Sequence, residues 1–206
     1  MGTPMAHLLH IDSSARTSDS LTRRLSAQYV AAWQARNPQG TVAYRDLAVE
    51  TPVPVSADWI TGVFAPPEHH TEEAKAAVAA ADVLIREVEA ADTLVLGVPV
   101  YNFNVPAVFK AWIDQVFMAG RTFAYSADGP HGLLTGKKAV VLRSSGSDLE
   151  HPAFAPMDFH APYIRGALGF VGITDVEIIS VNGLNPEQVT EALTKGTDAI
   201  TESLAA

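Results

Sequence analysis

Hydroxyl side chains gather in one short polar segment near the beginning of the chain. Residues 12–20 read DSSARTSDS and separate an apolar run from a helical stripe that begins at Leu21. Hydroxyl groups and free backbone N–H groups at a helix N-terminus favour a phosphate dianion, because the unpaired donors of the first turn and the helix dipole act together. This pattern predicts phosphate contacts at Ser13, Ser18 and Ser20. Ordinary helix capping by Ser18 or by the aspartate after it is the alternative that needs no ligand.

A second segment places aromatic and amide side chains between prolines. Residues 97–106 read GVPVYNFNVP and lie between an apolar run and a second helical stripe. In open α/β sheets, ligands bind beside the carboxyl ends of the strands, where the strand order switches. The prolines restrict the backbone of this loop, so we expect it to present Tyr101, Asn102 and Phe103 to a flat aromatic ligand. A proline-bounded connection whose aromatic rings simply pack is the competing explanation.

A third polar segment follows the next apolar run along the chain. It comprises Ser144, Ser145, Gly146 and Ser147. Because parallel strands with right-handed crossovers end at the same edge of a sheet, this loop should open beside the first two. Its N–H groups are suited to a pyrimidine carbonyl. One ligand with a phosphate at one end and a planar ring at the other accounts for all three loops, and FMN has this structure.

These loops need a parallel sheet to bring them together. Five short strand-like runs alternate with helical segments, at residues 7–11, 41–47, 93–98, 138–143 and 175–181. Such alternation is typical of parallel βαβ units. The runs at 94–98 and 139–142 are almost entirely apolar, as expected of strands that helices cover on both faces. The sequence therefore predicts an α/β fold with a doubly wound, five-stranded parallel sheet and helices on both faces.

Apolar residues four apart mark two of the intervening helices. The two sets are Leu21, Leu25, Tyr29 and Trp33, and Val105, Phe109, Ile113 and Phe117. Each set forms one stripe on a helix, and core packing is the ordinary explanation of such a stripe. Residues 51–70 interrupt the alternation with four prolines and several bulky apolar side chains. A connection of this length in a compact domain is a candidate lid or partner contact, or a structural cover over an apolar face.

The composition restricts the class of protein. The chain has 206 residues, of which 48% are hydrophobic and 18% charged, as expected of one compact domain over residues 1–206. A net charge of −9 argues against a nucleic-acid partner, because binding to phosphates on a polyanion needs a basic face. The chain has no cysteine and no apolar run long enough to span a bilayer. We therefore expect a cytoplasmic protein with no membrane partner and no thiolate chemistry.

Other nucleotide and hydrolase motifs fit the sequence less well. Gly166, Gly169 and Gly172 are evenly spaced, unlike the glycines of a dinucleotide-binding loop. Residues 132–138 (GLLTGKK) lead into a strand, whereas a P-loop leads into a helix. No G-x-S-x-G elbow is present to activate a serine nucleophile.

Two segments with histidine are weaker candidates for chemistry. His69 and His70 precede two glutamates, but adjacent histidines point in different directions and the H-E-x-x-H pattern is absent. We expect a solvated loop there and no metal site. His151 follows shortly after Asp148, near the third loop, and is a candidate proton donor, with a polar surface loop as the alternative.

The chain resembles the FMN-dependent NADH azoreductases, also called FMN-dependent NADH:quinone oxidoreductases, over nearly its whole length. The resemblance is carried, in order, by residues 13–20, 99–104 (PVYNFN), 128–138 (DGPHGLLTGKK) and 169–175 (GFVGITD). It implies a flavodoxin-like fold and a homodimer with each flavin near the subunit interface. In such a dimer, residues 51–70 and 125–131 would border the partner's pocket.

The resemblance also implies roles for the three loops. Ser13, Ser18, Asp19 and Ser20 would surround the FMN phosphate, Pro99, Val100, Tyr101, Asn102 and Phe103 would line the ring, and Ser144, Ser145, Gly146 and Ser147 would hold its pyrimidine side. NADH or NADPH would deliver hydride to the flavin and leave before a quinone or azo compound accepts it, a ping-pong scheme that requires no catalytic side chain. A flavodoxin-type electron carrier, which binds FMN but has no small-molecule substrate, is the alternative.

One departure from the family's usual sequence falls in the third loop. Where members commonly have Ser-Arg-Gly-Gly, residues 144–147 read Ser-Ser-Gly-Ser. By the resemblance, this loop lies beside the open face of the ring. The missing arginine and second glycine therefore bear on the choice of acceptor.

Overall fold

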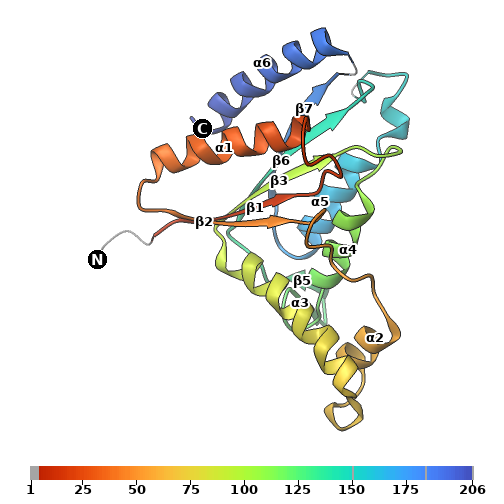
Figure 1. Ribbon diagram of the computed structural model, residues 1–206. Coiled ribbons are helices and arrows are strands. Elements are labelled where there is room, and N and C mark those ends of the chain that lie inside the picture. The colour runs from red at the N-terminus through yellow and green to blue at the C-terminus, as the bar shows by residue number, and fades with distance from the viewer. Residues whose placement is uncertain (1–4, 150, 184, 206) are drawn as a thin grey trace.

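The computed structural model describes residues 5–149, 151–183 and 185–205 and has a parallel sheet at its centre (Figure 1). The strands are β1 (His7–Asp12), β2 (Thr41–Asp46), β3 (Thr93–Pro99), β6 (Lys138–Ser145) and β7 (Asp175–Asn182). They lie in the order β2-β1-β3-β6-β7, and each neighbouring pair is parallel. This order is that of a flavodoxin-like sheet, with its switch point between β1 and β3. The predicted fold class and the five predicted strands are confirmed.

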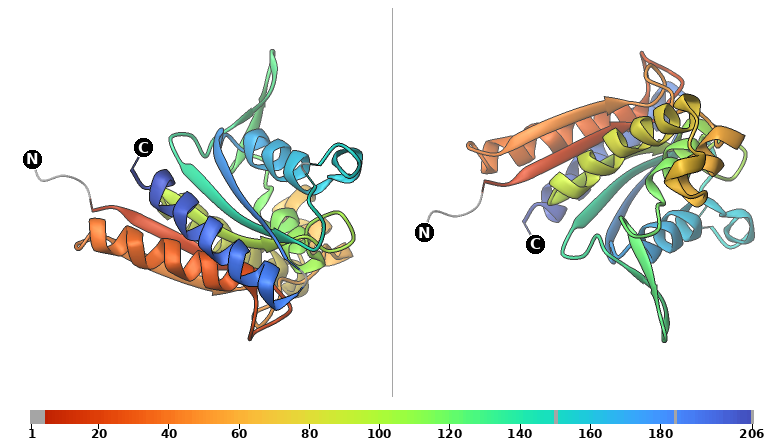
Figure 2. Two further views of the ribbon diagram at one scale, coloured as in Figure 1. Left: turned by 90° about the horizontal axis from the view of Figure 1, so that it is seen from above. Right: turned by 90° about the horizontal axis from the view of Figure 1, so that it is seen from below.

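Helices cover both faces of the sheet (Figures 1 and 2). α1 (Leu21–Arg36) and α6 (Pro186–Ser203) enclose one apolar core against the sheet. α3 (Glu72–Ala90), α4 (Ala107–Val116) and α5 (His160–Phe170) enclose the other. The two cores make the fold doubly wound, and the sheet between them fixes where the strand ends lie.

The central strand β3 supplies side chains to both cores. Leu94, Leu96 and Val98 join the core under α3, α4 and α5, whereas Val95 joins the core under α1 and α6. Successive side chains of a strand point to opposite faces, so a strand that is covered on both faces must be apolar throughout. For this reason, the apolar run at residues 94–98 correctly predicted a central strand.

The predicted helical stripes also face the cores. Leu25, Tyr29 and Trp33 of α1 are buried, as are Phe109 and Ile113 of α4. Residues three or four apart lie on one side of a helix, and burial of these side chains supplies much of the free energy that holds each helix on the sheet.

The segment 51–70 is more regular than its sequence suggested. It contains α2 (Ala57–Phe64) and a short 3₁₀ helix at Pro67–His69. The Ser56 hydroxyl caps α2 by accepting a hydrogen bond from the backbone N–H of Trp59 at 3.1 Å. Trp59 is buried in a small apolar cluster with Ala81 and Ile85 of α3. The structure thus places a helix, packed on α3, inside the proline-rich excursion.

A β-hairpin that no sequence pattern predicted projects from the body of the protein (Figure 2). It consists of β4 (Phe123–Ser126) and β5 (Gly129–Gly132), which pair antiparallel. Tyr125 on this hairpin is 72% exposed. Two strands alone are marginally stable in water, so this hairpin depends on its contacts with the end of α5.

None of the helices in the described ranges combines the length and the apolar character needed to cross a membrane.

Candidate functional site

The carboxyl ends of β1, β3 and β6 open into one cavity of about 280 Å³. Asp19 and Ser20 line it from the first loop, Pro99, Val100 and Tyr101 from the second, and Ser144, Ser145 and Gly146 from the third. Three loops far apart in the sequence therefore meet at the edge of the sheet where α/β proteins bind ligands. Ser13, Ser18, Asn102, Phe103 and Ser147 do not line this cavity.

The first loop ends in a capped helix N-terminus. Ser20 is the N-cap of α1, and its hydroxyl accepts a hydrogen bond from the backbone N–H of Arg23 at 3.4 Å. The preceding residue, Asp19, has a left-handed backbone with φ of 55°, a conformation that aspartate adopts more readily than most residues. The side chain of Arg16 also lines the cavity, and it makes no ion pair among the described residues. The loop thus combines backbone donors, a hydroxyl and one cation.

Ser14, and not Ser13, is the serine of the first pair that faces the cavity. Ser13 is completely buried, and both its backbone N–H and its hydroxyl donate to the carbonyl of Gly97, at 3.0 and 2.9 Å. Ser14 lines the cavity, where its hydroxyl lies 3.5 Å from that of Tyr101. Two adjacent serines carry no signal that says which of them points outward, so no sequence pattern predicts this role for Ser14.

The second loop contains a tight turn with a strained backbone. Tyr101 and Asn104 exchange two backbone hydrogen bonds, at 2.9 and 3.1 Å, around a two-residue turn. Both turn residues, Asn102 and Phe103, have positive φ, 48° and 71°, as in a type I′ turn. A bulky residue such as phenylalanine rarely adopts this conformation, and strain of this kind concentrates at ligand sites. Phe103 remains 45% exposed.

The third loop is tied to its neighbours by short hydrogen bonds. The carbonyl of Ser144 accepts from the backbone N–H of Val100 at 2.8 Å, which joins the second and third loops. The hydroxyl of Ser145 donates to Asn182 Oδ1 at 2.7 Å, and the same hydroxyl contacts the carbonyl of Ser147. The Ser145 side chain therefore holds the loop in shape.

A buried charged group supports the loops from below. Arg143 is 3% exposed; its Nη1 donates to Asp158 Oδ2 at 2.6 Å and its Nε to the Ser180 hydroxyl at 3.0 Å. Asp158 Oδ1 in turn accepts from the backbone N–H groups of His160 and Ala161 at the start of α5. Burial of the Arg143 charge is tolerated because Asp158 pairs with it, and removal of either partner would destabilise the folded protein. This group connects the end of β6 to the start of α5.

His160 anchors the end of β3 from within the same group. Its ring is fully buried, and Nε2 donates to the carbonyl of Val98 at 3.1 Å. Burial, together with the charge of Arg143, lowers the pKa of His160 to about 4. The side chain is therefore neutral at physiological pH. No local sequence pattern marks His160, because its partner lies 62 positions earlier in the chain.

The histidines considered from sequence take no part in the cavity. His151 is exposed, and its Nδ1 accepts from the backbone N–H of Ala153 at 3.2 Å within a local turn. His70 contacts the carbonyl of Ala65 through Nε2 at 2.9 Å. In the part of the chain that the structure describes, no group of three or more histidine, aspartate or glutamate side chains is arranged to hold a metal ion.

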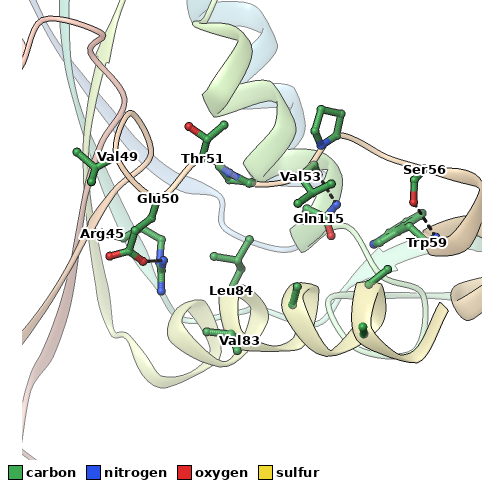
Figure 3. Close-up of a pocket in the computed structure, with 15 residues that line it drawn as sticks. Arg45, Val49, Glu50, Thr51, Val53, Ser56, Trp59, Val83, Leu84 and Gln115 are labelled. Atoms are coloured by element: carbon green, nitrogen blue, oxygen red, sulfur yellow. Dashed lines mark hydrogen bonds and ion pairs between the residues drawn. The ribbon is translucent and has the colours of Figure 1, made fainter. Parts of the chain in front are cut away.

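A separate groove of about 750 Å³ lies between the 49–56 segment, α2 and α3 (Figure 3). Val53, Leu84 and Trp59 are among its apolar lining residues. Its charged side chains already pair with each other, since Arg45 binds Glu50. Convergent polar groups are what fix a small molecule in an apolar pocket, and this groove offers an apolar surface instead.

A family model that describes the flavodoxin-like fold matches residues 6–204. Together with the strand order and the cavity at the switch point, this match defines the chain as a flavodoxin-like α/β protein.

Two relatives are similar to the chain over nearly its whole length. The FMN-dependent NADH:quinone oxidoreductase of Nostoc punctiforme is 45% identical over 205 residues, which cover 98% of this chain and 99% of the relative. The protein of the same description from Acidobacterium capsulatum is 43% identical, over 91% of this chain and 93% of the relative. Among solved structures, an azoreductase from Bacillus anthracis superimposes with a TM-score of 0.89 at 30% identity and covers 97% of this chain and 98% of its own. The chain belongs to the family of FMN-dependent NADH:quinone oxidoreductases.

Proposed function

We propose that the chain binds FMN non-covalently in the 280 Å³ cavity and uses it to pass hydride from NADH to quinones and azo compounds. The observation that carries the proposal is the convergence of three strand-end loops on one cavity, with a helix N-terminus at one end and the Pro99–Tyr101 segment at the other. The descriptions of the relatives support the choice of cofactor, donor and acceptor.

The first loop fits the phosphate of FMN. Backbone N–H groups at the start of α1 and the hydroxyls of Ser14 and Ser20 would donate to its oxygens, and Arg16 would add a positive charge. The left-handed backbone at Asp19 allows the N–H of that residue, and not its carboxylate, to face the anion. Ser18 would act from the rim of the loop.

The second and third loops fit the ring. Val100, Tyr101 and the turn at 102–103 would lie against one face, while backbone N–H groups at 144–147 would donate to the pyrimidine edge. The cavity is slightly smaller than the usual range for ligand sites, about 300–1,000 Å³. It would therefore hold the phosphate, the ribityl chain and one side of the ring, and leave the other face open.

Bound FMN would supply the redox chemistry, because flavins accept and return hydride. The protein would orient the ring, shield one face and place N–H donors where negative charge develops on reduction. The single open face would serve the donor and the acceptor in turn, as a ping-pong scheme requires. By the resemblance, the altered residues Ser145 and Ser147 would border this face, so we propose that they influence acceptor preference. We also propose a cytoplasmic location, because the chain has no cysteine to form the disulfides that are common in exported proteins.

Anaerobic titration of the purified protein tests this function. The protein should retain FMN through dialysis, show the visible absorption of oxidised flavin, and lose that absorption with one equivalent of NADH; a quinone should then restore it. Riboflavin serves as the control ligand, since it has the ring but no phosphate. A protein that stays colourless after excess FMN does not bind the cofactor. Bound flavin that NADH leaves oxidised, and that only a protein partner reduces, would instead identify an electron carrier.

We also propose that the protein is a homodimer. Large apolar side chains are exposed over α2, α3 and the hairpin, including Phe64 (70%), Val83 (52%) and Tyr125 (72%), and exposed apolar surface of this extent marks interaction sites. Sedimentation should give the mass of two chains, and Phe64→Glu should shift the protein toward one. Met5→Glu, a change of an equally exposed apolar residue before β1, should leave the dimer intact. A wild-type protein that sediments as one chain at micromolar concentration contradicts the proposal.

A further inference from the structure

One peptide group in the first loop is held from both sides. The carbonyl of Ser14 accepts a hydrogen bond from Arg23 Nη2 at 2.8 Å. The N–H of the same peptide, on Ala15, donates a hydrogen bond to the hydroxyl of Tyr101 at 3.2 Å. The C=O and N–H of a trans peptide point in opposite directions. Arg23 therefore draws the carbonyl away from the cavity, and the N–H is turned toward Tyr101, which lines it.

Arg23 is itself fixed in place by two carboxylates. Its Nη1 and Nη2 donate to Asp46 Oδ2 and Oδ1 at 2.6 and 2.7 Å, and Nη1 lies 3.7 Å from Asp12 Oδ2. The hydrogen bond from Arg23 lowers the pKa of Asp46, so the carboxylate stays charged near neutral pH. A bidentate contact of this kind gives a guanidinium a defined orientation. Asp12 is the last residue of β1, so the whole group lies directly beneath the loop.

The charge of Arg23 is already balanced by these neighbours. Asp46 and Asp12 place two carboxyl groups against the one guanidinium. The guanidinium therefore adds little attraction for an anion in the cavity, and its direct contact with the loop is the hydrogen bond to Ser14. Without that hydrogen bond, rotation of the 14–15 peptide would turn a carbonyl oxygen toward the cavity, where it would repel a phosphate.

We infer that Arg23 is a positioning residue for the cofactor phosphate, which it serves by holding the carbonyl of the Ser14–Ala15 peptide away from the cavity while the N–H of that peptide stays on the Tyr101 hydroxyl at the cavity wall. The inference rests on the proposed binding of FMN. It predicts that loss of Arg23 weakens binding of FMN, which has the phosphate, and leaves binding of riboflavin, which has only the ring and the ribityl chain, nearly unchanged.

The test compares FMN with riboflavin on the stripped protein. The double variant Arg23→Gln/Asp46→Asn removes one positive and one negative charge, so the net charge under the loop is unchanged. Hydrogen bonds to charged groups correspond to roughly 10- to 100-fold in a binding constant. We expect FMN affinity, measured by quenching of flavin fluorescence, to fall about 30-fold and riboflavin affinity to change less than about 3-fold.

The matched control is Arg45→Gln/Glu87→Gln. Arg45 makes a similar bidentate pair, with Nε donating to Glu87 Oε2 at 2.7 Å, and its side chain is buried to the same degree as that of Arg23, 14% against 13% exposed. Among the described residues, Arg45 makes its hydrogen bonds and ion pairs with Glu50 and Glu87 and none with the first loop, so both ligands should bind this variant as they bind the wild type. Arg23→Lys provides a second variant that keeps the charge but lacks the fork, and it should lose about 10-fold in FMN affinity alone.

Each outcome decides the question. Equal losses of FMN affinity and riboflavin affinity in the Arg23 variants would show a general structural role and overturn the inference. A folded Arg23 variant that binds FMN as tightly as the wild type would also overturn it. If the double variant fails to fold by circular dichroism, the lysine variant decides. A wild-type protein that binds FMN no more tightly than riboflavin would instead overturn the phosphate site itself, and the inference with it.

Discussion

Gly132→Ala should lower the free energy of unfolding by about 3 kcal/mol, the upper part of the range for overpacked sites. A Cβ at Gly132 would lie 2.0 Å from the backbone nitrogen of Gly172 and 2.1 Å from the carbonyl carbon of Val171. Backbone atoms cannot rotate away as side chains do, so β5 or the turn after α5 must move. That movement would also strain the hydrogen bond from Leu134 N–H to the Val171 carbonyl, now 2.8 Å. Urea denaturation measures the loss.

Gly169→Ala is the matched control for this prediction. Gly169 lies in α5, close in sequence to Gly172, and a Cβ there would meet no atom within 4 Å. Replacing a helical glycine with alanine usually stabilises by about 0.5–1 kcal/mol, so the two substitutions should act in opposite directions. Equal stability of the Gly132→Ala and wild-type proteins would mean that β5 does not approach α5 as closely as the structure has it.

The hairpin that contains Gly132 could not be predicted from local sequence. β4 and β5 have four residues each, and β5 reads Gly-Pro-His-Gly, which lacks the β-branched and aromatic residues that signal a strand. The hairpin is held by contacts with the end of α5, including the hydrogen bond at Leu134. Contacts between segments about 40 residues apart leave no local pattern in the sequence.

The central sheet, by contrast, was predictable from the sequence because its cause is local. The strand β3 is apolar from Leu94 to Pro99, since helices cover both of its faces. Once the strands are known, the rule that parallel strands end at one edge brings the three loops together. The cavity contains residues of all three predicted loops for this reason.

Finer features of the site depend on orientation and on distant partners. Ser13 and Ser14 are adjacent and chemically identical, and only the path of the chain after β1 decides that Ser13 turns inward to Gly97. The contact of Arg23 with Asp46 depends on the register of β1 against β2. Neither relationship follows from residue type and spacing alone.

The wild-type protein should become less stable between pH 7 and pH 4.5, and the His160→Gln variant should lose about 2 kcal/mol less over the same range. The pKa of His160 is about 4 in the folded protein against an ordinary value of 6.5. Between these values the unfolded chain binds a proton that the folded protein does not, so the free energy of unfolding falls as the pH falls through this window. Asp46, whose pKa is lowered, loses its contribution only at more acid pH, below its ordinary value. The window above pH 4.5 therefore reports mainly on the histidine.

Glutamine can keep the hydrogen bond to the Val98 carbonyl, since its amide also donates, but it has no proton to gain. Urea denaturation at the two pH values, at one protein concentration because a dimer's stability depends on it, gives the difference for each protein. His131→Gln, a change of an exposed histidine on the hairpin, should retain the pH dependence of the wild type. A His160→Gln protein that loses as much stability in acid as the wild type would mean that this ring already gains its proton without unfolding. The contact between His160 and the Val98 carbonyl, beneath the second loop, would then be accessible to solvent.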